Sequence, residues 1–136
     1  MGNLSYFLGF EVARSSTGIH LSQRKYALDL LRETGMIAAA PISTPMNFST
    51  KVSYEGQPLE DPTVFRRLIG RLIYLTNTRP DITCVVHCLS QYVASPTQAH
   101  HQAAFRILHY IKNTPGQGIF LSATSSLTLK AYSDSD

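Results

Sequence analysis

Four prolines, at positions 62, 80, 96 and 115, divide the second half of the chain and constrain its fold more than any other feature. Proline has a fixed φ and no backbone N–H, so it is tolerated in the first turn of a helix and disrupts the interior. Each stretch between successive prolines is long enough for a helix of ordinary length. The spacing therefore predicts three helices, over about 62–78, 80–93 and 96–113.

Apolar residues recur within these three segments at intervals of three and four, which is the pattern of an amphipathic helix. The ends carry further signals: Asp61 is a capping residue, Ser95-Pro-Thr-Gln98 reads as a capping box, and Thr114-Pro-Gly116 ends the last helix. We expect the core to be built from the apolar faces, which are Phe65, Leu68, Ile69, Leu72 and Leu75, then Ile82, Val85, Val86 and Leu89, then Ala99, Ala103, Ile107 and Ile111.

The start of the chain predicts a β-hairpin. Residues 4–13 alternate in part, Ser-Ser-Thr-Gly at 15–18 is rich in turn formers, and residues 19–21 resume an extended pattern. Gly9 lies inside the first predicted strand, where it weakens the strand unless a bulge forms or another backbone comes close. One face of this strand is expected to carry Tyr6, Leu8, Phe10 and Val12.

A fourth helix and a long loop follow this hairpin. Ser22 is the expected cap of a helix that runs to about Thr34, where Gly35 ends it. Residues 37–60 are rich in proline and glycine and read as a loop. This loop is long for a compact domain, so it is either a surface excursion or a functional arm.

A second hairpin is expected at the end of the chain, from residues 118–123 and 127–134 around a Thr-Ser-Ser turn. A lone hairpin is marginal in water, which suggests that more sheet follows and that the chain is a fragment. The fold class is therefore α+β, with an N-terminal β-hairpin, a four-helix central region and a C-terminal β-hairpin.

Composition excludes several classes of protein. Apolar residues make up 43% of the chain and charged residues 15%, which argues against disorder. No apolar run reaches the ~18 residues of a membrane-spanning helix. The N-terminus has neither the basic start nor the long apolar core of a signal peptide. We therefore expect an intracellular protein with no membrane partner.

The net charge of +3 comes from one segment. Residues 61–79 contain four arginines and one aspartate, while the rest of the chain is balanced. A local basic excess indicates contact with a polyanion, although a charged run is more often a solvated helix face.

Two clusters of reactive side chains are weak candidates for a catalytic or metal site. Cys84, His87 and Cys88 share a predicted helix face, but no second ligand pair lies nearby, so buried cysteines beside a core-edge histidine are the simpler interpretation. Asp134 and Asp136 lie two apart on a predicted strand and project to one face, as Mg²⁺ ligands can. Two carboxylates do not complete such a site, and a polar terminus is the simpler interpretation. No nucleophile elbow or phosphate-binding glycine loop is present.

The arginine-rich helix presents a sharper pattern. Arg66, Gly70 and Tyr74 are spaced i, i+4, i+8 and line one strip, with Arg67 and Arg71 beside it. A glycine inside a helix costs about 1 kcal/mol relative to alanine, so it needs a reason. The reason is either close approach to a nucleic-acid minor groove or a close crossing with another helix, and spacing alone does not separate the two.

Several motifs together resemble the Pol polyprotein of copia-type LTR retrotransposons. They cover nearly the whole chain in order, and the blocks at 65–82 and 89–119 are specific to the reverse transcriptase of that family. The matching stretches are YFLGFEV (6–12), LSQRKYALDLL (21–31), STPM (43–46), FRRLIGRLIYLTNTRPDI (65–82), LSQYVASPTQAHHQAAFRILHYIKNTPGQGI (89–119) and AYSDSD (131–136).

The resemblance implies a division of the chain and a set of site residues. Residues 1–21 resemble the primer-grip hairpin, 22–79 the thumb with a long loop at 37–60, 80–117 the helical connection, and 118–136 the start of ribonuclease H. The primer-grip match places Phe7, Leu8 and Gly9 beside nucleic acid. The thumb match shifts the interpretation of Gly70 toward the minor groove and implies nucleic-acid contacts by Arg66, Arg67, Gly70, Arg71 and Tyr74. Asp134 matches the first metal-binding, catalytic aspartate of ribonuclease H.

The same comparison implies that catalysis is incomplete. The polymerase aspartates of the family, including its Tyr-Val-Asp-Asp motif, lie upstream of residue 6, and the further ribonuclease H acids lie downstream of Asp134. Mg²⁺ serves the intact enzyme, and none is expected to bind this chain tightly. The expected partners are an RNA–DNA or DNA duplex, bound weakly and without sequence preference, and the remaining Pol domains. The alternative is a domesticated or remnant helical domain that acts as a protein-interaction module.

We expect the purified chain to show no DNA synthesis and no RNA cleavage with Mg²⁺, because the required carboxylates are missing. Primer extension on a homopolymer template and digestion of a labelled RNA–DNA hybrid measure the two activities. Extension or cleavage above a protein-free blank would refute this expectation.

Overall fold

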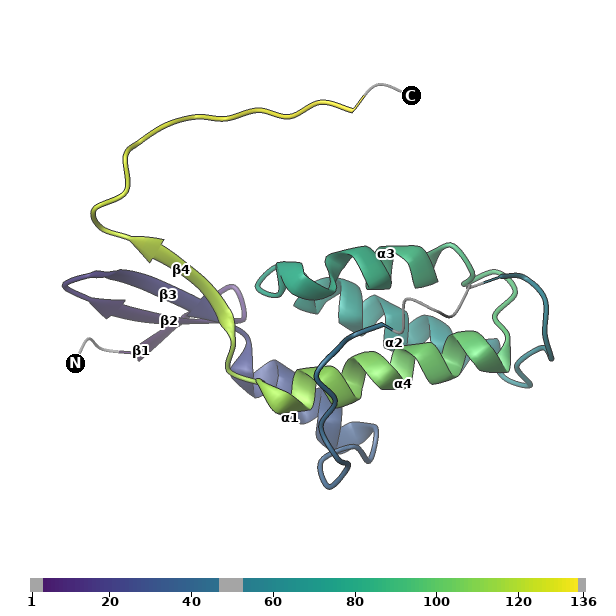
Figure 1. Cartoon of the computed structure of the whole chain (residues 1–136). Helices are drawn as coiled ribbons and strands as arrows, with labels where there is room; N and C mark the ends of the chain where they lie inside the picture. Colours follow the sequence, from purple (N-terminus) through teal and green to yellow (C-terminus); the bar gives the residue numbers. More distant parts are fainter. Residues whose placement is uncertain (1–3, 47–52, 135–136) are drawn as a thin grey trace.

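A computed structural model describes residues 4–46 and 53–134 and confirms the α+β class. A four-stranded antiparallel sheet lies at one end of the molecule, beside a body of helices (Figure 1). The strands are β1 (Leu4–Phe7), β2 (Phe10–Ser15), β3 (Gly18–Ser22) and β4 (Gly118–Ser122), in the order β1-β2-β3-β4. The helices are α1 (Arg24–Glu33), α2 (Pro62–Leu75), the 3-10 turn η1 (Pro80–Ile82), α3 (Thr83–Ser90) and α4 (Gln98–Asn113).

The predicted N-terminal hairpin is confirmed by the pairing of β2 with β3 around the turn that follows Ser15. The extent of its first strand is wrong, because residues 4–13 belong to two strands joined by a tight turn at Leu8 and Gly9. Both residues have positive φ, 51° and 83°, as a two-residue hairpin turn of this hand requires. Phe7 then pairs with Phe10 across the turn. The expected common face is therefore also wrong, since paired residues share a face and Tyr6 is opposite Glu11 rather than aligned with Phe10.

The predicted C-terminal hairpin is also wrong. β4 pairs with β3, in the register Leu21 opposite Ile119, and the described residues after Ser122 form no strand. The chain leaves the sheet through β3 into α1 and returns to it from α4. By pairing with the open edge of β3, β4 adds to an existing three-stranded sheet. A strand in such a sheet is more stable than one in an isolated two-stranded hairpin.

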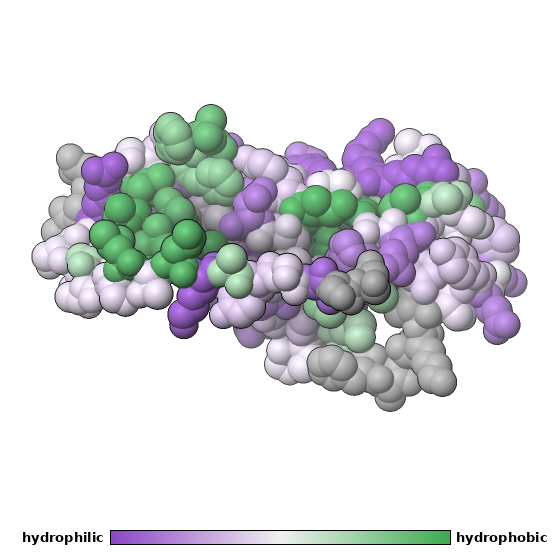
Figure 2. Space-filling model, turned by 90° about the horizontal axis from the view of Figure 1, so that it is seen from above, coloured by the Kyte–Doolittle hydropathy of each residue, from purple (hydrophilic) through white to green (hydrophobic). Residues whose placement is uncertain are grey.

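One face of this sheet is apolar and only partly covered. Val12 pairs with Leu21, Leu21 with Ile119, and Ile19 with Leu121, so the five side chains share a face. Figure 2 shows apolar side chains gathered at the end of the molecule that carries the sheet. Leu121 remains 52% exposed, while Ile19, Leu21 and Ile119 are half-buried.

The described residues form the four predicted α-helices, but the helix ends differ from the predicted ones. Asp61 caps α2 as predicted, its carboxylate accepting from the Thr63 N–H at 2.9 Å. Ser22, in contrast, belongs to β3, and α1 is capped from another strand: the Glu11 carboxylate accepts the Arg24 N–H at 2.9 Å. A carboxylate also suits the positive end of the helix dipole.

The capping box of α4 begins two residues later than predicted. Thr97 is the N-cap and His100 is its reciprocal partner, in place of Ser95 and Gln98. The buried stripe shifts with it, because Ala99 is exposed and Ala103 only half-buried. The residues buried on α4 are His100, Ala104, Ile107, Leu108 and Ile111.

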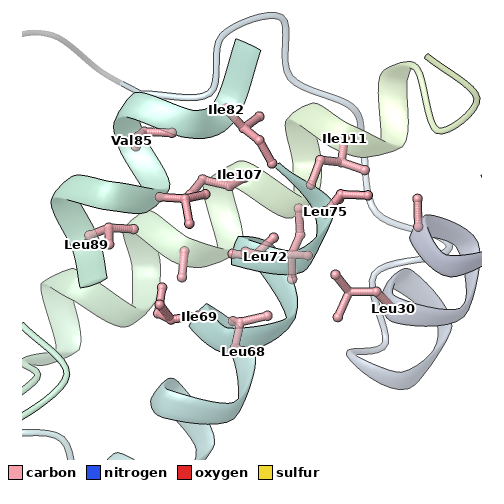
Figure 3. Packing of buried hydrophobic residues seen from close by; sticks show 14 of the residues in the cluster. Leu30, Leu68, Ile69, Leu72, Leu75, Ile82, Val85, Leu89, Ile107 and Ile111 are labelled. Atoms are coloured by element: carbon pink, nitrogen blue, oxygen red, sulfur yellow. The ribbon is translucent and has the colours of Figure 1, made fainter. Parts of the chain in front are cut away.

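The core lies between the helices, and α2 is its centre (Figure 3). The apolar residues predicted for α2, η1 and α3 are all buried. Leu30 and Leu31 of α1 and Met36 complete the cluster. None of the helices in the two described ranges is long and apolar enough to cross a bilayer.

The described parts of the loop after α1 lie at the surface and are hydrogen-bonded to α4 and to the residues just before it. The Ile42 N–H donates to the His109 carbonyl at 3.1 Å, and the Leu59 N–H donates to the Pro96 carbonyl at 3.0 Å. Of the two interpretations of residues 37–60, the described parts support the surface excursion. Residues 47–52 lie outside the described ranges.

Arg79 forms a buried polar cluster at the junction of α2, η1 and α4. Its guanidinium, 1% exposed, donates to both Asp81 oxygens at 3.1 and 2.9 Å and to the Thr114 carbonyl at 2.7 Å. The Tyr110 hydroxyl donates to Asp81 at 2.6 Å. Burial of the Asp81 carboxyl raises its pKa, but the hydrogen bonds from Arg79 and Tyr110 outweigh this, and the pKa lies below its ordinary value.

Arg79→Met should lower the free energy of unfolding by about 3 kcal/mol near neutral pH, since it leaves a partly buried carboxylate without its cation. Because the folded pKa of Asp81 is depressed, the ion pair stabilises the chain at neutral pH and is lost as the pH falls below about 4. Urea unfolding of both proteins at several pH values tests this. A difference between them that does not shrink in acid would contradict it.

Candidate nucleic-acid interface

The outward face of α2 and the β1–β2 turn form one continuous surface. Leu8 and Tyr74 are 66 residues apart in sequence, yet the Tyr74 hydroxyl donates to the Leu8 carbonyl at 3.1 Å. The structure thus brings the Leu8–Gly9 turn and the residues around Tyr74 together. Of the predicted nucleic-acid contacts, Phe7, Leu8, Arg66, Arg67 and Gly70 are exposed, whereas Arg71 is partly covered.

Gly70 lies in the middle of the exposed face of α2. A Cβ built at this position would meet nothing within 4 Å outside its own helix. A close crossing with another described helix is therefore excluded as the reason for this glycine. Because glycine has no side chain, the backbone of α2 is open here, between Arg66 one turn before it and Tyr74 one turn after it.

The four arginines of residues 61–79 differ in their availability to a ligand. Arg79 is buried in the cluster described above. Arg71 forms an ion pair with Glu33, and its guanidinium lies 5.3 Å from the centre of the Tyr26 ring. Burial lowers the pKa of Arg71, but Tyr26 and Glu33 outweigh this and raise it overall. Both side chains are therefore charge-compensated within the fold.

Arg66 and Arg67 carry the charge that remains on this surface. Arg66 donates from Nε to the Val93 carbonyl at 2.7 Å and from Nη2 to the Ala94 carbonyl at 3.2 Å. These neutral acceptors hold the side chain in place without cancelling its charge. Arg67 forms no hydrogen bond or ion pair with the described residues. A polyanion on α2 would thus meet one cation held by hydrogen bonds and one exposed cation.

Leu8 occupies an unusual position for its residue type. It has φ 51° in the turn and is 74% exposed, although such turns favour asparagine, aspartate or glycine. Left-handed backbone costs a residue with a Cβ roughly 1–2 kcal/mol. With Phe7, 67% exposed, it forms an apolar tip beside the basic face of α2. A strained, exposed apolar residue is more typical of a contact site than of a stabilised turn.

The remaining predicted site residues do not join this surface. Asp134 is exposed in the extended segment after β4, and Asp136 lies outside the described residues. No group of three histidine, cysteine or acidic side chains in residues 4–46 and 53–134 can hold a metal ion. Cys84 is exposed and Cys88 half-buried, so the prediction of two buried cysteines is wrong.

Sequence reasoning counted Arg79 as a basic surface residue and missed its burial. Asp81, two residues further on, was the available signal, because an aspartate this close can accept both branches of a guanidinium. The supports of Tyr74 were also missed. Its ring stacks on Phe10 with 6.2 Å between ring centres and packs edge-to-face with Tyr26 with 4.9 Å between ring centres, and both contacts join elements remote in sequence.

Comparison with known proteins finds relatives that match nearly the whole chain. It is 54% identical over 98% of its length to a retrovirus-related Pol polyprotein from transposon RE1 of Arabidopsis thaliana. It is 30% identical over its whole length to the corresponding protein of transposon TNT 1-94 of Nicotiana tabacum. An uncharacterized mitochondrial protein of Arabidopsis thaliana is 38% identical, over 57% of that protein. No family model matches the chain, and no solved structure does.

The chain is thus homologous to one segment of a much larger kind of protein, the retrotransposon polyprotein. The relatives from transposons RE1 and TNT 1-94 are Pol polyproteins, as the resemblance to copia-type Pol indicated. The chain spans only 9% of the length of the two Arabidopsis polyproteins that it matches.

Leu8→Asn should stabilise the chain by about 1 kcal/mol, because asparagine adopts left-handed backbone more readily and an exposed leucine loses little burial. Thermal unfolding measures this, with Leu127→Asn as a control for removing an exposed leucine elsewhere. A variant no more stable than the natural chain would show that the turn is not strained.

Proposed function

We propose that this chain is the template–primer-contacting region of a retrotransposon reverse transcriptase and is catalytically incomplete on its own. The observation that carries the proposal is the continuous surface made by α2 and the β1–β2 turn, joined at Tyr74 and Leu8. The homology to Pol polyproteins supports it independently.

The residues of this surface suit a duplex bound without sequence preference. Arg66 and Arg67 would contact phosphates, which provides affinity but reads no bases. The open space at Gly70 would let the backbone of α2 approach the floor of a minor groove. Phe7 and Leu8 would lie against the sugar and base surface of the primer strand. With so few cations, binding would be weak, in the range of non-specific complexes.

The rest of the polyprotein would supply what the chain lacks. We propose that residues 118–136 begin ribonuclease H, with Asp134 as one of several carboxylates that hold Mg²⁺ in the intact enzyme. Neighbouring Pol domains would cover the partly exposed apolar sheet face around Leu21, Ile119 and Leu121, of which Leu121 is 52% exposed. An exposed apolar patch is the kind of surface that marks contact with another protein.

Salt dependence of duplex binding tests the proposal. On an RNA–DNA hybrid, log K against log salt should fall linearly, and Arg67→Ala should lessen the slope by about 0.9, the share of one phosphate contact. Fluorescence anisotropy of a labelled hybrid over a range of salt concentrations measures this. Arg67 is the preferred variant, because removing Arg66 would also break two hydrogen bonds within the fold.

Arg14→Ala is the matched control, since Arg14 is an exposed arginine near the far end of β2 from the Leu8–Gly9 turn. It should leave the slope unchanged. Equal slopes for the natural chain and Arg67→Ala would mean that α2 does not meet phosphates. Absence of any salt-dependent binding would favour the alternative of a protein-interaction module.

A further inference from the structure

Tyr74 connects the β1–β2 hairpin to α2 through two contacts and makes a third with α1. Its hydroxyl donates to the Leu8 carbonyl at 3.1 Å, its ring stacks on Phe10, and it packs edge-to-face with Tyr26 of α1. The Leu8 carbonyl belongs to the turn itself, outside the paired residues Phe7 and Phe10. The phenol therefore satisfies a backbone acceptor that the hairpin ladder leaves unpaired.

Gly9 provides the space that this hydroxyl occupies. A Cβ built on Gly9 would lie 2.5 Å from the Tyr74 oxygen, closer than real contacts allow, while the nearest ring carbon is 3.7 Å away. The positive φ of Gly9 already suits the turn. The absence of a side chain thus serves a second purpose, which is to let the turn close onto the phenol.

Contacts between α1 and α2 also hold Tyr74 in place. The Tyr26 hydroxyl donates to the Arg71 carbonyl at 3.2 Å, and the Arg71 guanidinium pairs with Glu33 of α1. Tyr74 is consequently held between two helices and the hairpin. Within the described residues, its bond to Leu8 is the hydrogen bond that links the β1–β2 turn to α2.

We propose that Tyr74 is a positioning residue, whose hydroxyl seats the Leu8–Gly9 turn against α2, rather than a side chain that stacks on nucleic acid. The effect of Tyr74 on duplex binding rests on the function proposed above, whereas its effect on the β1–β2 hairpin does not. Its role is to keep the apolar tip and the two exposed arginines in register as one surface.

Hydrogen exchange of the free chain tests the structural part. Tyr74→Phe keeps the ring and removes one hydrogen bond, so amides of residues 4–15 should exchange about fivefold faster, which corresponds to a net bond of about 1 kcal/mol. Amides in the core of α2 and α4 should be unchanged. Tyr132→Phe is the matched control, because Tyr132 is 91% exposed in the segment after β4, and it should change neither region.

A double-mutant cycle with Gly9→Ala sharpens the test. In the natural chain the added Cβ would displace the hydroxyl, whereas in Tyr74→Phe only ordinary contact with the ring remains. Gly9→Ala should therefore accelerate hairpin exchange more in the natural chain than in Tyr74→Phe. Equal effects in both backgrounds would show that the hydroxyl and Gly9 are not coupled, and would overturn the proposal.

Duplex affinity separates positioning from stacking. If Tyr74 positions the turn, Tyr74→Phe should lose most of the affinity that Tyr74→Ala loses. If its ring stacks on a base, Tyr74→Phe should bind as the natural chain does, and the proposal fails. Should the natural chain bind no duplex, the proposed function fails alone, because exchange and the double-mutant cycle still decide the role of Tyr74. Unchanged exchange over 4–15 in Tyr74→Phe would overturn it.

Discussion

The arrangement of the helices depends on the ion pair and hydrogen bonds of the buried Arg79 guanidinium. A buried cation needs a counter-charge and acceptors for its N–H groups, and Asp81 and Thr114 provide them. Asp81 lies in η1, so the turn after α2 must bend back at Pro80. Thr114 follows the last residue of α4, so α4 must end beside this turn. The cluster thereby sets where the chain re-enters the sheet as β4, four residues after Thr114.

The surface proposed to meet nucleic acid is built on the opposite side of the same helix. One side of α2 is fully packed in the core, which fixes the direction of its other side. The hairpin then comes to this exposed side because Glu11 caps α1 and Tyr74 holds the turn. A rigid helix with a short turn fastened to it can present charge and apolar surface in a constant geometry. A binding surface made of two separate, mobile loops would lose more conformational entropy on contact.

The arginines illustrate how far charge counting can mislead. The net excess of residues 61–79 suggested one basic strip, yet the four side chains have four different environments. Arg79 neutralises Asp81 inside the fold, and Arg71 is paired with Glu33. Arg66 rests on carbonyl groups, and Arg67 extends into solvent. Only the latter two contribute fully to the field that a phosphate backbone would meet, so the effective basic surface is smaller than the sequence indicates.

The sequence by itself determined the helices, because proline positions and apolar spacing are local properties of the chain. It also determined the core residues of α2, η1 and α3, and its motifs identified the Pol relationship. Only the tertiary structure decided the pairing of β4 with β3, since the two strands are nearly 100 residues apart and β4 needs a strand edge that its neighbours in sequence do not provide. The pairing of β2 with β3, in contrast, was predicted from the turn at 15–18. The turn at Leu8 was missed because leucine disfavours the backbone it adopts there. The contact of Tyr74 with Leu8 and Gly9, and the burial of Arg79, likewise follow from packing between distant segments, which no local pattern encodes.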